Sequence, residues 1–363
     1  MLLHPQAILL LLAGITSPAA SQTPPSLINA LVASGASQFA SIIQSDSEVL
    51  SLYLSDRVTT VFAPIDSCVG DSPLQERDLS ASQRRAAAFQ SARGTTTLET
   101  ASRSLPGSSL ETNDEAPLLD GRGQRIVIDT RPLNATSPTK RWASSAILRR
   151  QVNGTAQSLL RISSGLGKTT NVIKGDIPYD GGIIHITDSY FTMPQSLSAT
   201  SQATGQTAFA QQLSLSNTTS TLDTTHSVTV FLPSNAAFSS FPNSTAPQQL
   251  VSDHVVPGTV SYLPDLRDGS VLTTQRGETL AISVRAGRYY VNGGLITQAN
   301  LVLENGVAHV VDRVSLCLNC ATKTQVLKPT PAPPATAAAS SVSMSSIGLL
   351  GVLVYYVGKM VLA

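Results

Sequence analysis

The spacing of apolar residues predicts helices near the start of the chain. Residues with the three- and four-residue spacing of an amphipathic helix are Leu27, Ile28, Leu31, Val32, Phe39, Ile42 and Ile43. Further along, the β-branched and aromatic run Thr60–Phe62 predicts a buried strand, which Pro64 ends because proline has no N–H for a ladder. Ala286-Gly287 lies between the strand-like runs 280–284 and 288–291 and predicts a hairpin. Helices thus precede strand-rich sequence, which indicates an α+β fold.

Two sequence blocks occur twice in the same order. Thr60–Asp66 resembles Thr229–Asn235 at an offset of 169 residues, and Gly182–Asp188 resembles Gly306–Asp312 at an offset of 124 residues. Each block is rich in β-branched residues, so each predicts a strand. The repeat therefore predicts two copies of one domain, with 45 more residues between the blocks of the first copy.

The extra residues of the first copy are expected within about 71–150. This stretch holds 12 of the 24 Lys and Arg residues and offers one convincing strand, Arg125–Asp129. We therefore interpret it as a long surface insertion that is ordered at most in part. Its dibasic pairs, Lys140-Arg141 and Arg149-Arg150, are typical of solvated surface charge, and processing by a protease is the alternative.

Both ends of the chain carry the patterns of targeting segments. Residues 1–20 combine an apolar run with small residues, which is typical of a secretory signal peptide. Residues 319–341 are rich in Pro, Ala and Ser, and 342–363 lead into an apolar tail. This order predicts a stalk and a GPI-attachment signal, with a membrane-spanning helix as the alternative. The two predicted domains lie between these ends, at residues 24–194 and 195–318.

Composition narrows the classes of function. Charged residues make up 13% of the chain and the formal net charge is +1. Nucleic-acid binding needs a dense Lys/Arg surface, so we predict no nucleic-acid partner.

In a secreted chain, Asn-Xaa-Ser/Thr sequons predict N-glycans on exposed loops. The sequons here begin at Asn134, Asn153, Asn217 and Asn243. The cysteines are Cys68, Cys317 and Cys320. With three thiols, one disulfide and one free or intermolecular thiol are expected.

Two segments resemble chemical motifs but lack an essential part. Gly165–Thr169 resembles a phosphate-binding loop, yet Ile162 stands where that loop needs its first glycine. Cys317 and Cys320 have redox spacing, but they lead into a Pro-rich segment instead of opening a helix after a strand. We therefore predict no cofactor site, and the histidines show no close metal-ligand spacing.

The second block of each copy contains a His and an Asp that could suggest a hydrolase dyad. His185 and Asp188, like His309 and Asp312, are three positions apart on a predicted strand. Side chains at that separation point to opposite faces of a strand. We therefore predict no catalytic residue, and we expect each group to bind backbone or loop partners.

The blocks resemble the two signature boxes of the fasciclin domain. The first box is similar to Thr229–Phe238 and the second to Asn305–Val314. A middle motif, which in the family normally begins Tyr-His, is similar to His254, Val255, Val256, Pro257 and Gly258. Asp253 stands in the place of the tyrosine. The first copy has Cys68-Val69 where the family tends to have Ala-Phe, and it has no clear middle motif.

The resemblance implies two tandem domains of an α+β fold, each a β-wedge packed with helices. It also implies cell adhesion, or association with extracellular matrix or cell wall, often on a lipid anchor. The middle motif, His254–Gly258, is the candidate adhesion motif because binding in the family has been tied to it. The expected partners are wall or matrix components, protein or glycan, and the membrane through the anchor. A secreted hydrolase acting on wall glycans and a purely structural wall protein are the alternatives.

Overall fold

The structure is a computed structural model, and it describes residues 23–71, 73–74, 79–103, 106–129, 160–241 and 245–314. The predicted signal peptide, stalk and anchor signal lie outside the described residues. So do Asn134, Asn153, Asn243, Cys317 and Cys320. Among the helices that are described, none is both long and apolar enough to cross a membrane.

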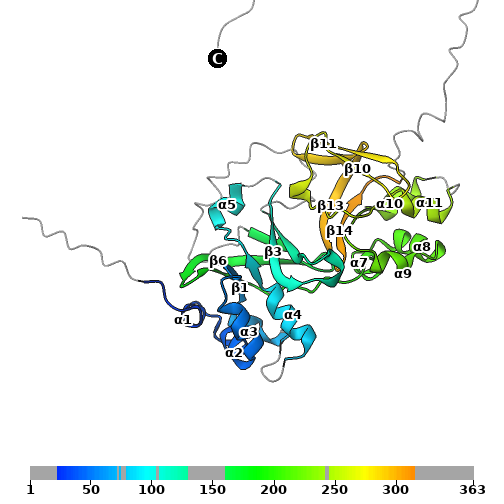
Figure 1. Cartoon of the computed structure of the whole chain (residues 1–363). Coiled ribbons are helices and arrows are strands. Elements are labelled where there is room, and N and C mark those ends of the chain that lie inside the picture. Colours follow the sequence, from blue (N-terminus) through cyan, green and yellow to red (C-terminus); the bar gives the residue numbers. More distant parts are fainter. Residues whose placement is uncertain are drawn as a thin grey trace, which may run out of the picture. The chain divides into compact units, whose positions relative to one another are not determined.

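The first half of the chain packs helices against a closed barrel of seven strands. The strands, in barrel order, are β1 (Thr60–Pro64), β2 (Ser91–Arg93), β3 (Ser108–Glu115), β4 (Gly123–Asp129), β5 (Leu160–Ser163), β6 (Thr169–Tyr179) and β7 (Gly182–Thr187). The helical elements are α1 (Leu27–Ala33), α2 (Ser37–Ser45), α3 (Ser47–Tyr53), η1 (Asp66–Asp71), α4 (Ala81–Phe89), α5 (Leu98–Arg103) and η2 (Pro117–Leu119). Figure 1 shows α2, α3 and α4 grouped beside the barrel, and a core cluster of their apolar side chains packs on β1 and β7.

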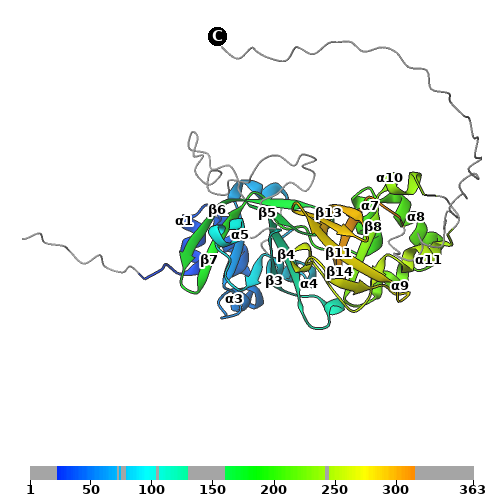
Figure 2. The same cartoon turned by 90° about the horizontal axis from the view of Figure 1, so that it is seen from above.

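The second half combines a helical group with one sheet of seven strands. The strands are β8 (Val228–Pro233), β9 (Val255–Val256), β10 (Val271–Thr273), β11 (Thr279–Arg285), β12 (Arg288–Val291), β13 (Gly294–Leu303) and β14 (Gly306–Val311). The helical elements are α7 (Leu197–Ala203), α8 (Thr207–Leu215), α9 (Thr219–Thr224), α10 (Asn235–Ser239), α11 (Pro247–Ser252) and η3 (Leu263–Asp265). Figure 2 shows α7, α8, α10 and α11 gathered together. The hairpin predicted at Ala286-Gly287 joins β11 to β12.

The two halves follow one strand plan, which confirms the predicted duplication and the α+β class. The second sheet has the order β10-β11-β12-β13-β14-β8-β9. This is the barrel order of the first half, opened between the strands that correspond to β2 and β3. In both halves the last strand returns parallel to the first, as β7 beside β1 and as β14 beside β8. The expected β-wedge is thus a closed barrel in the first half and an open sheet in the second.

The structure corrects the interpretation of residues 71–150 for the part that it describes. Residues 81–129 are not a surface excursion with one strand, because they form α4, β2, α5, β3 and β4. The strands among them correspond to β9, β10 and β11 of the second half. The halves differ most after β4, which ends at Asp129 while β5 begins at Leu160; the equivalent β11 and β12 are separated only by Ala286-Gly287. Polar sequence hid β2 and β3, since β3 reads Ser-Ser-Leu-Glu-Thr-Asn-Asp-Glu, whereas the strand predicted at Arg125–Asp129 is part of β4.

The residue that ends the first block caps a helix in both halves. Asp66 accepts hydrogen bonds from Gln38 N (2.9 Å) and from the Ser37 hydroxyl (2.7 Å) at the start of α2. Asn235 accepts one from Ala208 N (3.0 Å) at the start of α8. Because a helix begins with unpaired N–H groups, these side chains tie the helical layer to the end of the central strand.

A buried glutamine links the two halves. Gln124 on β4 donates from Nε2 to the Leu303 carbonyl at the end of β13 (2.7 Å), and its Oε1 accepts from the Tyr262 hydroxyl (3.3 Å). Val127, Val302 and Val307 pack beside Tyr262 in one small apolar cluster. Both polar side chains are buried, so each needs the partner that the other half supplies.

Candidate functional site

The box strands place an aromatic ring and a histidine side by side in each half. In the parallel β1–β7 pair, Phe62 is the register partner of His185; in the β8–β14 pair, Phe231 is the partner of His309. The rings stack with centroids 5.4 Å apart and planes at 27° in the first half, and 5.6 Å apart at 25° in the second. The blocks recognised in the sequence thus occupy matching surroundings.

Each histidine uses both ring nitrogens on backbone groups. Nε2 lies 2.8 Å from the Thr96 carbonyl for His185 and 2.9 Å from the Ser261 carbonyl for His309. Nδ1 faces a backbone N–H at 3.4 Å, from Asp176 and Asn300 respectively. Since a carbonyl only accepts and an N–H only donates, these contacts fit a neutral ring protonated at Nε2.

Burial keeps these rings neutral. It lowers the pKa of His309 to about 4 and lowers the pKa of His185 in the same direction, because a charged imidazolium would lose its hydration. The Nε2 contact to a carbonyl opposes this shift in each case. The expectation that these groups bind backbone partners is confirmed for both histidines.

The aspartate of each pair also accepts a hydrogen bond from a backbone N–H group. Asp188 accepts from Asn171 N and Asp312 accepts from Leu295 N, each at 2.8 Å. Each carboxylate thereby holds the start of its terminal hairpin. With the histidine and the aspartate committed to different backbone groups, neither half assembles the dyad that the spacing suggested.

The middle motif is mostly part of the interior. His254, Val255 and Val256 are buried, while Pro257 and Gly258 are exposed. The two valines form β9, which pairs with β8. His254 Nδ1 lies 2.7 Å from the Leu250 carbonyl, and burial lowers the pKa of His254 to about 4. Adhesion through this motif stays a prediction, and only its Pro257-Gly258 end is available at the surface.

Asp253, in the place of the family's tyrosine, pairs with Arg276 at 3.1 Å. The Asp253 side chain is 12% exposed and the Arg276 side chain 41% exposed. Burial raises the pKa of the Asp253 carboxyl, and the nearby Arg276 opposes that rise. The pair joins the end of α11 to the turn between β10 and β11.

The first half does contain a counterpart of the middle motif, which the sequence did not reveal. Phe62 N donates to the Gln90 carbonyl (2.8 Å) just as Phe231 N donates to the His254 carbonyl (2.9 Å). Gln90-Ser91-Ala92-Arg93-Gly94 therefore takes the place of His254–Gly258. The shared signal is the glycine at the end, with φ of 93° at Gly94 and 70° at Gly258. A glycine alone is too common to mark a motif.

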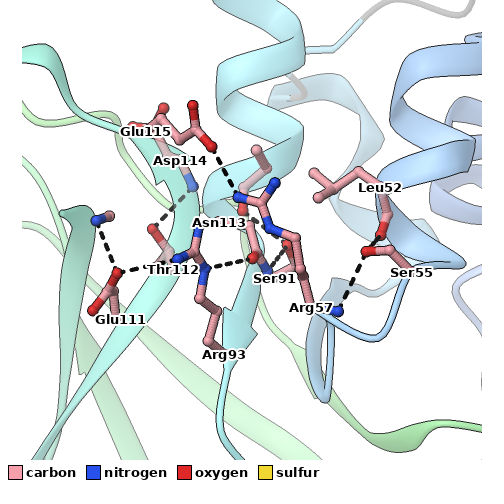
Figure 3. A network of polar contacts seen from close by, with 12 residues as sticks. Leu52, Ser55, Arg57, Ser91, Arg93, Glu111, Thr112, Asn113, Asp114 and Glu115 are labelled. Carbon is pink, nitrogen blue, oxygen red and sulfur yellow. Dashed lines mark hydrogen bonds and ion pairs between the residues drawn. The ribbon is translucent and has the colours of Figure 1, made fainter. Parts of the chain in front are cut away.

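A polar ladder covers one face of β2 and β3 (Figure 3). We use the term β2–β3 ladder for Arg57, Arg93, Glu111, Asn113 and Glu115. Arg57 donates to Glu115 (2.9 Å), and Arg93 donates to Asn113 (3.1 Å) and lies 3.6 Å from Glu111. The three β3 residues alternate along the strand and so share a face. Two arginines offset two glutamates, which leaves the ladder with no net charge to attract a charged ligand.

The other face of β3 carries a buried ion pair. Arg85 on α4 binds both oxygens of Asp114, at 2.9 and 3.2 Å. The Asp114 carboxylate is fully buried. Burial raises its pKa, and the hydrogen bonds and charge of Arg85 oppose the rise. This two-point contact fixes α4 on the barrel.

Two of the remaining predicted sites, Asn217 and Cys68, are among the described residues. Asn217 is exposed in the turn between α8 and α9. Cys68 is half-buried and its Sγ lies 2.6 Å from the Asp188 carbonyl; its disulfide partner stays a prediction. Within the described ranges, no three His, Cys, Asp or Glu side chains gather as metal ligands.

Comparison with known proteins gives a consistent result. The Fasciclin domain signature matches residues 204–316. A fasciclin-like arabinogalactan protein of Arthroderma benhamiae is 37% identical over 186 residues, which cover 50% of this chain and 44% of that protein. One of Cercospora beticola is 35% identical over 176 residues, covering 46% of each. The chain thus spans less than half the length of these relatives.

A solved pair of FAS1 domains from the insect cell adhesion molecule Fasciclin I is a weak structural likeness. It has a TM-score of 0.36 and 16% identity, and the alignment covers 78% of this chain and 97% of that one. Residues 204–316 are therefore similar to the Fasciclin domain, and the first half of the chain repeats the topology of that region.

Proposed function

We propose that this chain is a non-enzymatic glycoprotein of the cell surface or cell wall. In this proposal its two domains are displayed on a C-terminal lipid anchor and bind wall or matrix components. The sequence relatives and the targeting patterns at both chain ends support it. Two weakly binding copies on one chain add their contacts through a high effective concentration.

One observation carries the non-enzymatic part of the proposal. The polar residues that recur in both halves, His185 with Asp188 and His309 with Asp312, are bonded to backbone groups of their own domain. A general base must instead reach a substrate proton. The recurring residues thus support the fold. In this proposal, wall or matrix components bind to surfaces that differ between the copies.

Attachment to the cell surface by a lipid anchor is tested with the full chain expressed in a fungal host. Phosphatidylinositol-specific phospholipase C is applied to intact cells, and the released protein is measured. Release into the medium is expected. Protein that stays with the cells after treatment, yet is extracted by detergent, would contradict the lipid anchor and favour a spanning helix.

Adhesion is tested by binding of the released protein to isolated cell walls. Pro257→Glu changes the exposed end of the middle motif, and Gln202→Glu on α7 adds the same charge at another exposed position. If the motif binds the wall, only Pro257→Glu weakens binding. Equal binding by both variants would exclude the motif, and loss of wall glycan during incubation would favour the hydrolase. No wall binding by the unaltered protein would favour a purely structural role.

A further inference from the structure

Asn217 occupies a special position in the turn between α8 and α9. It has a left-handed backbone with φ of 54°. Its N–H donates to the Ser214 carbonyl (3.2 Å), and Thr218 N donates to the Leu213 carbonyl (3.3 Å). This pair of bonds is the Schellman ending of a helix, in which the left-handed residue is usually glycine and sometimes asparagine.

The left-handed backbone accounts for an asparagine at this position, but it does not require a sequon or exposure to solvent. Glycine would adopt this conformation at lower cost. Asn217 is followed by Thr218 and Thr219, which completes a sequon, and it is exposed to solvent. The Asn217 side-chain amide makes no hydrogen bond to the part of the chain that the structure describes, so its nitrogen is available for modification.

An exposed apolar residue precedes this asparagine by two positions in the sequence. Leu215, the last residue of α8, is 59% exposed. The other exposed large apolar side chains among the described residues are Val32, Leu54 and Val271, and none of them is near Asn217 in the sequence. A sugar ring has one apolar face, and covering Leu215 with it would remove apolar surface from water.

We propose that Asn217 carries an N-linked glycan whose first sugar covers Leu215. The inference rests on the proposed surface location, because the modification requires entry into the secretory pathway. The Asn217 amide nitrogen bonds to the anomeric carbon of an oligosaccharide carried on a lipid pyrophosphate. The bond from that carbon to the pyrophosphate oxygen breaks, the lipid pyrophosphate leaves, and the amide nitrogen loses one proton. No oxidant or reductant is needed.

Occupancy is tested by site-resolved mass spectrometry of the full chain made in a fungal host. Removal of the glycan by peptide N-glycosidase in heavy-oxygen water should convert Asn217 to a labelled aspartate. Thr219→Ala should abolish the label, whereas Thr218→Ala is the matched control and should keep it, because the middle position of a sequon is free. An unlabelled Asn217 in secreted protein would overturn the proposal.

A second form of the chain distinguishes a failure of the glycosylation site from a failure of the proposed secretion. In it, residues 1–22 are replaced by an established secretion leader. A labelled Asn217 in this form, with no label in the natural chain, would refute the natural chain's secretion while sustaining the site. No label in either form would overturn the site itself.

Coverage of Leu215 is tested by thermal unfolding of a chain with Asn134, Asn153 and Asn243 changed to Gln. Trimming the Asn217 glycan to its first sugar should leave the melting temperature unchanged, and complete removal should lower it. In a Leu215→Ser background, complete removal should have little effect. An equal drop in both backgrounds would show that the sugar does not cover Leu215.

Discussion

Acid should destabilise the second domain through its buried histidines, and His254 offers the cleanest test. It is fully buried, its Nδ1 contacts the Leu250 carbonyl, and its pKa is lowered to about 4 from an ordinary value of 6.5. In the first domain the corresponding position is occupied by Gln90, which does not titrate. His254→Gln therefore replaces the histidine with the residue that the other copy already accepts.

The sign and size follow from proton binding. Because the folded pKa is the lower one, the unfolded chain binds more protons, and stability is lost as the pH falls from 6.5 toward 4. One pKa unit is worth about 1.4 kcal/mol. Between pH 7 and pH 5, His254 should therefore cost the unaltered domain about 2 kcal/mol of unfolding free energy. His309 should cost a similar amount in both proteins, since its pKa is also about 4.

The assay is urea unfolding followed by circular dichroism at pH 7, 6 and 5. The His254→Gln variant has a different stability at pH 7, so the comparison is between the losses that each protein shows on acidification. The variant should lose about 2 kcal/mol less than the unaltered protein. Equal losses would refute the reasoning, because they would mean that His254 is already protonated in the fold or stays neutral in the unfolded chain.

Three further substitutions test the packing. Gly306→Ala should destabilise the second domain by about 3 kcal/mol or more, since a Cβ there would overlap the Val228 carbonyl, and a large fall in melting temperature checks it. Asn235→Ala removes the cap of α8 and should cost about 1 kcal/mol in urea unfolding, with Asn235→Asp losing less. Gln124→Ala removes the hydrogen-bond partner of the buried Tyr262 hydroxyl and should cost about 1–3 kcal/mol; unchanged hydrogen exchange along β13 would contradict it.

The sequence revealed the parts of the fold whose side chains are both apolar and repeated. Thr60–Phe62 and its counterpart at 229–231 are buried on both faces, so strand propensity and burial point to the same assignment. The similarity of Gly182–Asp188 to Gly306–Asp312 then located the partner strands β7 and β14. Duplication was predictable because the two strands of the central parallel pair have similar residues in both copies.

The polar strands were not predictable in the same way. β3 pairs its Asp114 with Arg85 of α4 and its Glu111 with Arg93 of β2, so charged residues are satisfied by partners distant in sequence. Strand patterns detect apolar faces and not such pairings. The match of Gln90 to His254 was hidden for a related reason, because both are defined by a backbone hydrogen bond to β1 or β8, which any side chain permits.

The two copies differ in some parts of the fold and agree in others, which bears on the binding that we propose. Both keep the Phe–His stack and the capping residue at the end of the first block, so these contacts cannot distinguish one copy from the other. They differ at the middle motif and in the strand after it, where β3 closes a barrel but the three-residue β10 leaves the second sheet open. If the proposed binding differs between the two domains, this edge, from Pro257-Gly258 to β10, is one surface that a partner could use to distinguish them.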